Sequence, residues 1–204
     1  KIKGYYGHRC DGEKNVEMKM PLIEAMLKYK QEKMYPFHTP GHKGGRGMES
    51  SLRSELGESV LMDVSLMSEL DDIHEPETYI KEAQALAAKV YGSDACFWAV
   101  NGTSQAIHAM LMTALKPGEK VLLPRNAHRS VAGGLILGGI EATFMQPDYC
   151  EAFGINLQVQ PQDVEDALQK DASIKAVLLT SPNYYGVAAD VEAIAKICHE
   201  RNVV

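Results

Sequence analysis

Four short, nearly continuous apolar segments in the second half of the chain alternate with stretches of helical periodicity, and this alternation restricts the fold most. Apolar strands separated by helices are typical of crossover units that build a buried, mostly parallel sheet. We therefore predict an α/β domain with three layers, in which helices cover both faces of the sheet. The expected strands are 95–100 "ACFWAV", 120–124 "KVLLP", 141–146 "EATFMQ" and 175–180 "KAVLLT". The expected helices are 104–115, 129–139, 161–170 and 190–202.

The first part of the chain lacks the alternation of apolar strands and helices. Residues 21–33 form a predicted helix that starts at Pro21, whereas 35–50, "YPFHTPGHKGGRGMES", contain too much proline and glycine for regular structure. A further helix is expected over 76–92. We place a boundary here: 1–75 as an N-terminal helix and loop segment, and 76–204 as part of a larger layered domain. At the other end, Val203 and Val204 are expected to open a fifth strand, so the sequence is interpreted as the front part of a longer protein.

Composition narrows the function classes. The formal net charge of −6 argues against nucleic acid or an anionic membrane surface as the main partner. The four cysteines are widely spaced and form no CxxC pair, so we predict no metal site and a reducing, cytoplasmic setting. The N-terminal "KIKGYYGHRCDGEK" lacks the apolar core of a signal peptide, and no apolar run has membrane-spanning length.

The segment "VNGTSQAIHAML" places Gly102, Thr103 and Ser104 where an expected strand leads into a helix. Glycine lets the backbone approach a ligand, and the two hydroxyls stand beside the free N–H groups of the helix start. Such a terminus suits a phosphate. An ordinary threonine or serine cap without a ligand is the simpler alternative, because these residues are preferred at helix starts.

His128 follows the next expected strand, in the loop "RNAHRS". At the adjacent strand end its ring could lie flat against a planar heteroaromatic ligand that is anchored by a phosphate at residues 102–104. Neither GxxxxGK[ST] nor GxGxxG occurs, so a nucleotide is not indicated. "HTPGH" spaces His38 and His42 by four residues, but the intervening proline and glycine rule out the helix of a zinc protease.

With these motifs in order, the chain resembles the bacterial ornithine/lysine/arginine decarboxylases, pyridoxal-phosphate enzymes of the aspartate-aminotransferase fold (fold type I). The resemblance runs from about Pro21 to the end. It is carried by five segments: "PFHTPGHKGG", "LDDIHEPETYIKEAQ", "VNGTSQAIHAML", "PGEKVLLPRNAHRSV" and "LLTSPNYYGVAADVEAIAKICHE".

The resemblance implies the site residues. Gly102, Thr103 and Ser104 match the phosphate-binding turn for pyridoxal 5'-phosphate, and His128 matches the histidine that stacks on the cofactor ring. Thr180, Ser181 and Tyr184 match a loop that faces the same pocket, with less specific roles. The resemblance makes His38 and His42 candidates for substrate-side contacts near the entrance and the dimer interface.

Two family residues have no match in this sequence. They are the aspartate of a D-E-A-H motif and the Schiff-base lysine of an S-x-H-K motif, both expected beyond Val204. Lys43 in "GHK" precedes the sheet and is not assigned as that lysine. We therefore expect this chain alone to be inactive.

The implied function of the full-length protein is decarboxylation of arginine, lysine or ornithine to a polyamine-type amine and CO2, in a homodimer or higher homo-oligomer. Two alternatives stay open. One is another enzyme of the same fold type, such as an aminotransferase or a carbon–sulfur lyase. The other is a non-catalytic module, if the gene ends at Val204.

Overall fold

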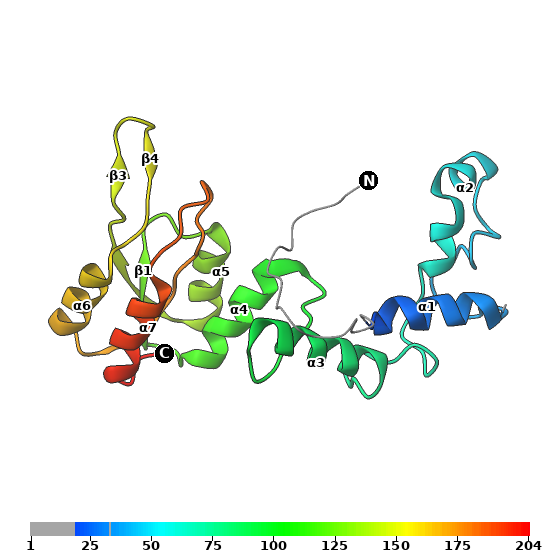
Figure 1. Ribbon diagram of the computed structural model, residues 1–204, viewed down its shortest axis with the longest axis horizontal. Helices are drawn as coiled ribbons and strands as arrows, with labels where there is room; N and C mark the ends of the chain where they lie inside the picture. Colours follow the sequence, from blue (N-terminus) through cyan, green and yellow to red (C-terminus); the bar gives the residue numbers. More distant parts are fainter. Residues whose placement is uncertain (1–18, 33) are drawn as a thin grey trace, which may run out of the picture. The chain divides into compact units, whose positions relative to one another are not determined.

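The computed structural model describes residues 19–32 and 34–204, so the segment examined for a signal peptide lies outside the described residues. The chain divides into two compact units, the first ending at Trp98 and the second covering Ala99–Val204. Figure 1 shows the helices and strands of both units.

The second unit is built around a three-stranded parallel sheet in the order β2-β1-β5. Its strands are β1 (Lys120–Pro124), β2 (Glu141–Met145) and β5 (Ile174–Val177). All three agree with predicted strands. Parallel neighbours need a crossover connection, and the helices between these strands provide it. The hydrogen bonding of β1 continues past β5, because the N–H of Leu178 donates to the carbonyl oxygen of Leu122 at 2.9 Å.

Helices cover both faces of this sheet, as Figure 1 shows. They are α4 (Gly102–Ala114), α5 (Arg129–Gly138), α6 (Pro161–Lys170) and α7 (Val191–Glu200). Successive β1 side chains point to opposite faces. Val121 and Leu123 pack with Leu111 of α4 and Val131 of α5, whereas Leu122 belongs to the core under α6 and α7. The three-layer prediction is confirmed.

The expected strand at 95–100 is wrong. This segment has no regular structure, and Phe97 and Val100 are 84% and 71% exposed. An isolated extended segment gains no ladder hydrogen bonds, and the sheet of this unit pairs β1 only with β2 and β5. An apolar composition alone is therefore not sufficient for this segment to join the sheet.

The last residues extend the sheet, as the prediction of a fifth strand requires. The N–H of Val204 donates to the carbonyl of Lys175 at 3.0 Å, and the N–H of Val177 donates to the carbonyl of Val204 at 2.8 Å. One residue bonded to two residues of the neighbouring strand in this way is the pattern of a parallel pair. Val203 is buried in the α6–α7 core.

A short antiparallel hairpin, β3 (Tyr149–Cys150) and β4 (Ile155–Asn156), rises from the second unit and was not predicted. Two-residue strands carry no periodicity that a sequence pattern could reveal. Its turn contains Gly154 at φ +65°, a conformation that favours glycine.

The first unit is mainly helical. It contains α1 (Pro21–Glu32), α2 (Ser50–Leu56), the 3₁₀ helix η1 (Gly57–Met62) and α3 (Tyr79–Tyr91). Both expected helices are present, and α3 ends at Gly92 in the left-handed conformation. α1 packs on α3 and η1, and the buried side chains include Ala25, Val60 and Ala88.

The helix α3 joins the first unit here, although the predicted boundary after residue 75 assigned it to the second segment. Packing against α1 buries its apolar face, which explains the grouping. The boundary at 75 stays a prediction for the organisation of the whole protein.

Candidate functional site

The first element of the candidate site is the start of α4. The helix begins at Gly102, whose φ of +76° favours glycine, and a Cβ atom there would have no neighbour within 4 Å. Thr103 and Ser104 form the first turn, and both are exposed. Among the described residues, no side chain accepts a hydrogen bond from the N–H groups of this turn. The helix start therefore offers free donors and two hydroxyls in open space.

The simpler alternative, a threonine or serine cap, is not what the structure shows. The N-cap is Asn101, and its side chain makes no capping hydrogen bond. Instead, the backbone N–H of Asn101 donates to Oε1 of Gln105 at 3.0 Å. Thr103 and Ser104 lie inside the helix, so their hydroxyls are not used to close its first turn.

His128 caps α5, the helix that follows β1. Its Nδ1 accepts the backbone N–H of Ser130 at 3.2 Å and lies 2.8 Å from the hydroxyl of that residue. Both contacts use Nδ1, so the neutral ring carries its proton on Nε2. Ser130 is buried whereas His128 is exposed, which fixes the ring by one edge and leaves it open to solvent.

The two helices run in parallel, which follows from the residues that meet along them. His108 of α4 lies against Gly133 and Gly134 of α5, and one turn further on Met112 lies against Gly138. Because the contacts advance together along both helices, the two starts lie at the same end of the pair. The structure thus brings the 102–104 turn and His128 to one end of the second unit, the carboxyl end of β1.

The loop 180–187, which carries the predicted residues Thr180, Ser181 and Tyr184, follows β5 at the same edge of the sheet. Ser181 accepts the N–H of Ala189 through its hydroxyl at 3.0 Å, and Tyr184 is 95% exposed. The loop is held by two amide side chains that sequence reasoning did not single out. Asn183 accepts the N–H groups of residues 185 and 187 and donates to the carbonyls of residues 156 and 157. Gln158 donates to the carbonyls of residues 180 and 187.

Asparagine in a Pro-Asn turn is a recognisable local signal, because its side chain commonly bonds to the backbone two residues on. Gln158 carries no such signal. It is 6% exposed, and its amide finds the two backbone carbonyls only because the segment after β4 packs against the loop.

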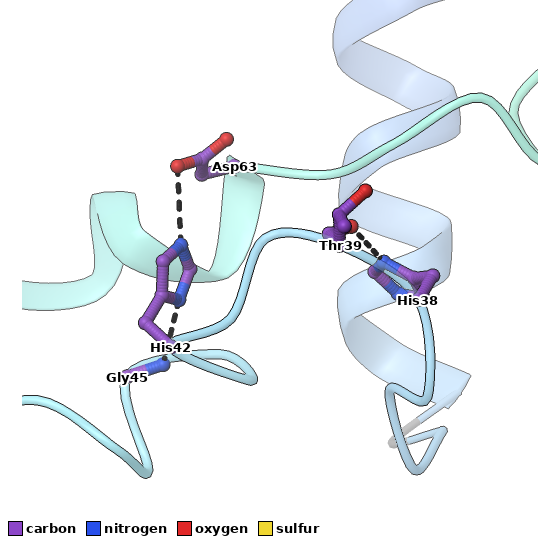
Figure 2. A network of polar contacts seen from close by, with 5 residues as sticks. All are labelled: His38, Thr39, His42, Gly45 and Asp63. Carbon is purple, nitrogen blue, oxygen red and sulfur yellow. Dashed lines mark hydrogen bonds and ion pairs between the residues drawn. The ribbon is translucent and has the colours of Figure 1, made fainter.

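His38 and His42 lie in the first unit, and each uses both ring nitrogens in local contacts. Figure 2 shows both contacts of His42 and the contact of His38 with Thr39. The N–H of Gly45 donates to Nδ1 of His42 at 3.1 Å, so Nε2 carries the proton and donates to Asp63 at 3.1 Å. His38 contacts the carbonyl of Thr39 through Nδ1, and its Nε2 lies 2.9 Å from the hydroxyl of Tyr29. In this arrangement the two rings hold the loop together, and their substrate-side role stays a prediction.

Lys43 belongs to the same loop and donates through Nζ to the backbone carbonyl of His38. In the described ranges, 19–32 and 34–204, no cluster of metal-ligating side chains occurs. None of the helices in those ranges has the length and apolar character needed to cross a bilayer.

The comparison with protein families decides the affiliation. Residues 20–204 match the family described as "Orn/Lys/Arg decarboxylase, major domain". The chain belongs to the Orn/Lys/Arg decarboxylase family. The resemblance inferred from the motifs is thereby confirmed.

Relatives within the family are similar over most of this chain. The arginine decarboxylase of Bacillus cereus is 39% identical over 184 residues, which cover 90% of this chain and 40% of that protein. The inducible lysine decarboxylase of Escherichia coli is 30% identical over 142 residues, covering 66% of this chain and 20% of that protein. The chain therefore spans 40% or less of these relatives.

Solved structures agree on the fold. Lysine decarboxylase A from Pseudomonas aeruginosa superposes with a TM-score of 0.71 at 24% identity, over 87% of this chain and 26% of that chain. The constitutive lysine decarboxylase of Escherichia coli gives a TM-score of 0.67 at 24% identity, over 80% of this chain and 25% of that chain.

The residues at the parallel helix starts fit a phosphorylated aromatic cofactor. The free N–H groups and hydroxyls at 102–104 are donors suited to a phosphate, and no atom lies within 4 Å of the Cβ position at Gly102. The exposed ring of His128, held by its Nδ1, offers a flat surface at the same end.

Proposed function

We propose that this chain supplies the phosphate-binding and ring-stacking part of a pyridoxal-phosphate-dependent decarboxylase that acts on a basic amino acid. The observation that carries the proposal is the common end of α4 and α5. An uncapped helix start with two free hydroxyls and a histidine whose ring is fixed and exposed lie at that same end, and this supports the proposal. Membership of the Orn/Lys/Arg decarboxylase family supports the reaction class.

In this proposal Gly102, Thr103 and Ser104 bind the phosphate. The backbone N–H groups of the first turn and the two hydroxyls donate to its oxygens, and the positive end of the helix dipole adds to the attraction. No hydroxyl has to leave a partner in the protein, because the described contacts assign none to Thr103 or Ser104.

His128 orients the ring. Its Nδ1 stays bonded to Ser130, so the imidazole keeps one plane while its face packs on the cofactor. Bound pyridoxal 5'-phosphate supplies an electron sink for the electron pair left on the α-carbon when CO2 departs. This chain's contribution is to hold and orient, whereas the lysine expected to bind the cofactor covalently has no match in this sequence.

Arginine is the substrate we put first among the basic amino acids. Four relatives from Bacillus and Halalkalibacterium that are named arginine decarboxylase are 36–39% identical to this chain. Two relatives from Escherichia coli, the inducible lysine decarboxylase and the biodegradative arginine decarboxylase, are 30% and 29% identical. We also propose that the full-length protein is a homo-oligomer in the cytoplasm. Light scattering on the purified full-length gene product tests the oligomeric state.

The deciding experiment uses the full-length gene product. Release of CO2 from arginine, lysine and ornithine is assayed, and retention of pyridoxal 5'-phosphate is measured in Ser104→Ala and His128→Ala. Both substitutions should weaken cofactor binding about tenfold or more, since each removes one point of attachment. His199→Ala is the matched control, because this exposed histidine lies at the end of α7.

Unchanged cofactor retention in both variants would reject the site assignment. If no basic amino acid loses CO2 but a keto acid accepts an amino group, the protein is an aminotransferase. If the product neither binds the cofactor nor turns over, a non-catalytic module replaces both proposals.

A further inference from the structure

The α4 and α5 helices are in close contact where His108 faces Gly134. A Cβ atom at Gly134 would lie 3.5 Å from the Cα of His108 and 2.6 Å from Cδ1 of Leu111. Real Cβ atoms do not come as close as the second distance, so the end of the Leu111 side chain would have to move for any residue larger than glycine, whereas the first distance is an ordinary contact. This close approach is the crossing point of the pair.

The imidazole of His108 lies beside the crossing point, over Gly133. A Cβ atom at Gly133 would lie 3.0 Å from Nε2 and 3.4 Å from Cε1 of the ring. Because side chains of a helix lean toward its N-terminus, the ring lies between the first halves of the two helices.

The imidazole of His108 places a polar nitrogen in the apolar contact between the two helices. Nε2 of His108 is buried and has no hydrogen-bond partner among the described residues. A buried polar atom without a partner costs stability, and an apolar side chain of the same size would avoid the cost. The other charged or titratable side chain on these two helices is Arg129, at the start of α5.

We propose that His108 is a positioning residue: its ring is a wedge that sets the separation of the starts of α4 and α5. The inference rests on the proposed function, because those starts carry the phosphate turn and His128. The turn at 102–104 precedes His108 by four to six residues, about 6–9 Å along the helix. His128 precedes Gly133 by five residues, about 7.5 Å. A change in the thickness of the wedge therefore moves both halves of the site.

The test changes the thickness of the wedge from both sides in the full-length gene product. His108→Ala removes the ring and lets the helices close, whereas Gly133→Ala adds a methyl group against the ring and forces them apart. Each should weaken equilibrium binding of pyridoxal 5'-phosphate, and of inorganic phosphate as a competitor, about tenfold. The double variant should regain most of the affinity, because the new methyl group fills space that the ring left.

Two further variants separate positioning from general stability. His108→Leu keeps a side chain of similar volume without the buried nitrogen, so it should keep cofactor affinity within about twofold and unfold at a higher temperature. Gly138→Ala is the control, since its Cβ atom would meet Ile140 at 2.7 Å and not His108. It should lower stability without being rescued by His108→Ala.

The outcomes distinguish this inference from the proposed function. If Ser104→Ala weakens cofactor binding but His108→Ala and Gly133→Ala do not, the wedge is refuted and the site stands. A tenfold loss of affinity in a folded His108→Leu protein would also overturn it, even if His108→Ala fails to fold. If Ser104→Ala and His128→Ala leave binding unchanged, the proposed function itself is wrong.

Discussion

The carboxylate of Asp71 accepts the backbone N–H of Ile80 at 2.9 Å and thereby ties the start of α3 to a residue nine positions earlier. It also accepts the N–H groups of Asp72, Glu77 and Thr78. Asp71 is 7% exposed and has φ +80°, a conformation rare outside glycine. One buried carboxylate thus organises the whole approach to α3.

Removing this carboxylate should destabilise the first unit. Asp71→Ala leaves four backbone N–H groups without their acceptor, so we expect a loss of about 2–3 kcal/mol in the free energy of unfolding. Urea denaturation and amide exchange at residues 77–80 measure the effect. Asp72→Ala is the control, because that carboxylate accepts one exposed N–H, from His74. Equal losses in the two variants would contradict the assignment.

Asp71 should also make the first unit sensitive to acid. Burial raises the pKa of its carboxyl, but the four backbone hydrogen bonds outweigh burial and lower the pKa to about 2. A carboxyl whose pKa is lower in the folded state stabilises the fold above its unfolded pKa of about 4. This contribution is lost as the pH falls from about 4 toward 2. Asp71→Asn should flatten the stability profile in that window, and an unchanged slope would refute the role.

Gly45 is required by its conformation and by its neighbours. It has φ +82°, is buried, and a Cβ atom there would lie 3.0 Å from Cγ1 of Val60. Gly45→Ala should cost about 1–3 kcal/mol and disturb the hydrogen bond to His42, which NMR of the imidazole can follow. Gly41→Ala is the matched control in the same loop, since nothing lies within 4 Å of its Cβ position. A larger loss at Gly41 would contradict this arrangement of the loop.

Asn183 should contribute more to the stability of the 180–187 loop than the neighbouring side chain of Tyr184. Asn183→Ala removes four hydrogen bonds to the backbone, so we expect a loss of about 2–3 kcal/mol and faster amide exchange at residues 185 and 187. Tyr184→Ala removes a 95% exposed side chain and should change stability by less than about 0.5 kcal/mol. The reverse ranking would show that Tyr184 packs on something in solution.

Part of the fold could be predicted because its signals are local. The strands at 120–124 and 141–145 and the helix at 161–170 have bounds close to those expected, since each combines clear periodicity with a turn or proline at its edge. The segment 95–100 has the same apolar character but forms no strand. A strand exists only when another strand bonds to it, and no property of the segment itself supplies that partner.

The sequence by itself determined the layered α/β class and the residue types of the candidate site. Hydrophobic periodicity, glycine positions and motifs are properties of residues close together in the chain, and the local backbone preferences that they reflect do not depend on tertiary contacts. Only the tertiary structure decided that α4 and α5 run in parallel with His108 between them, and that Asn183, Gln158 and Asp71 hold their loops. Those relationships join residues far apart in the chain, and their energies come from burial and hydrogen bonds that exist only after packing.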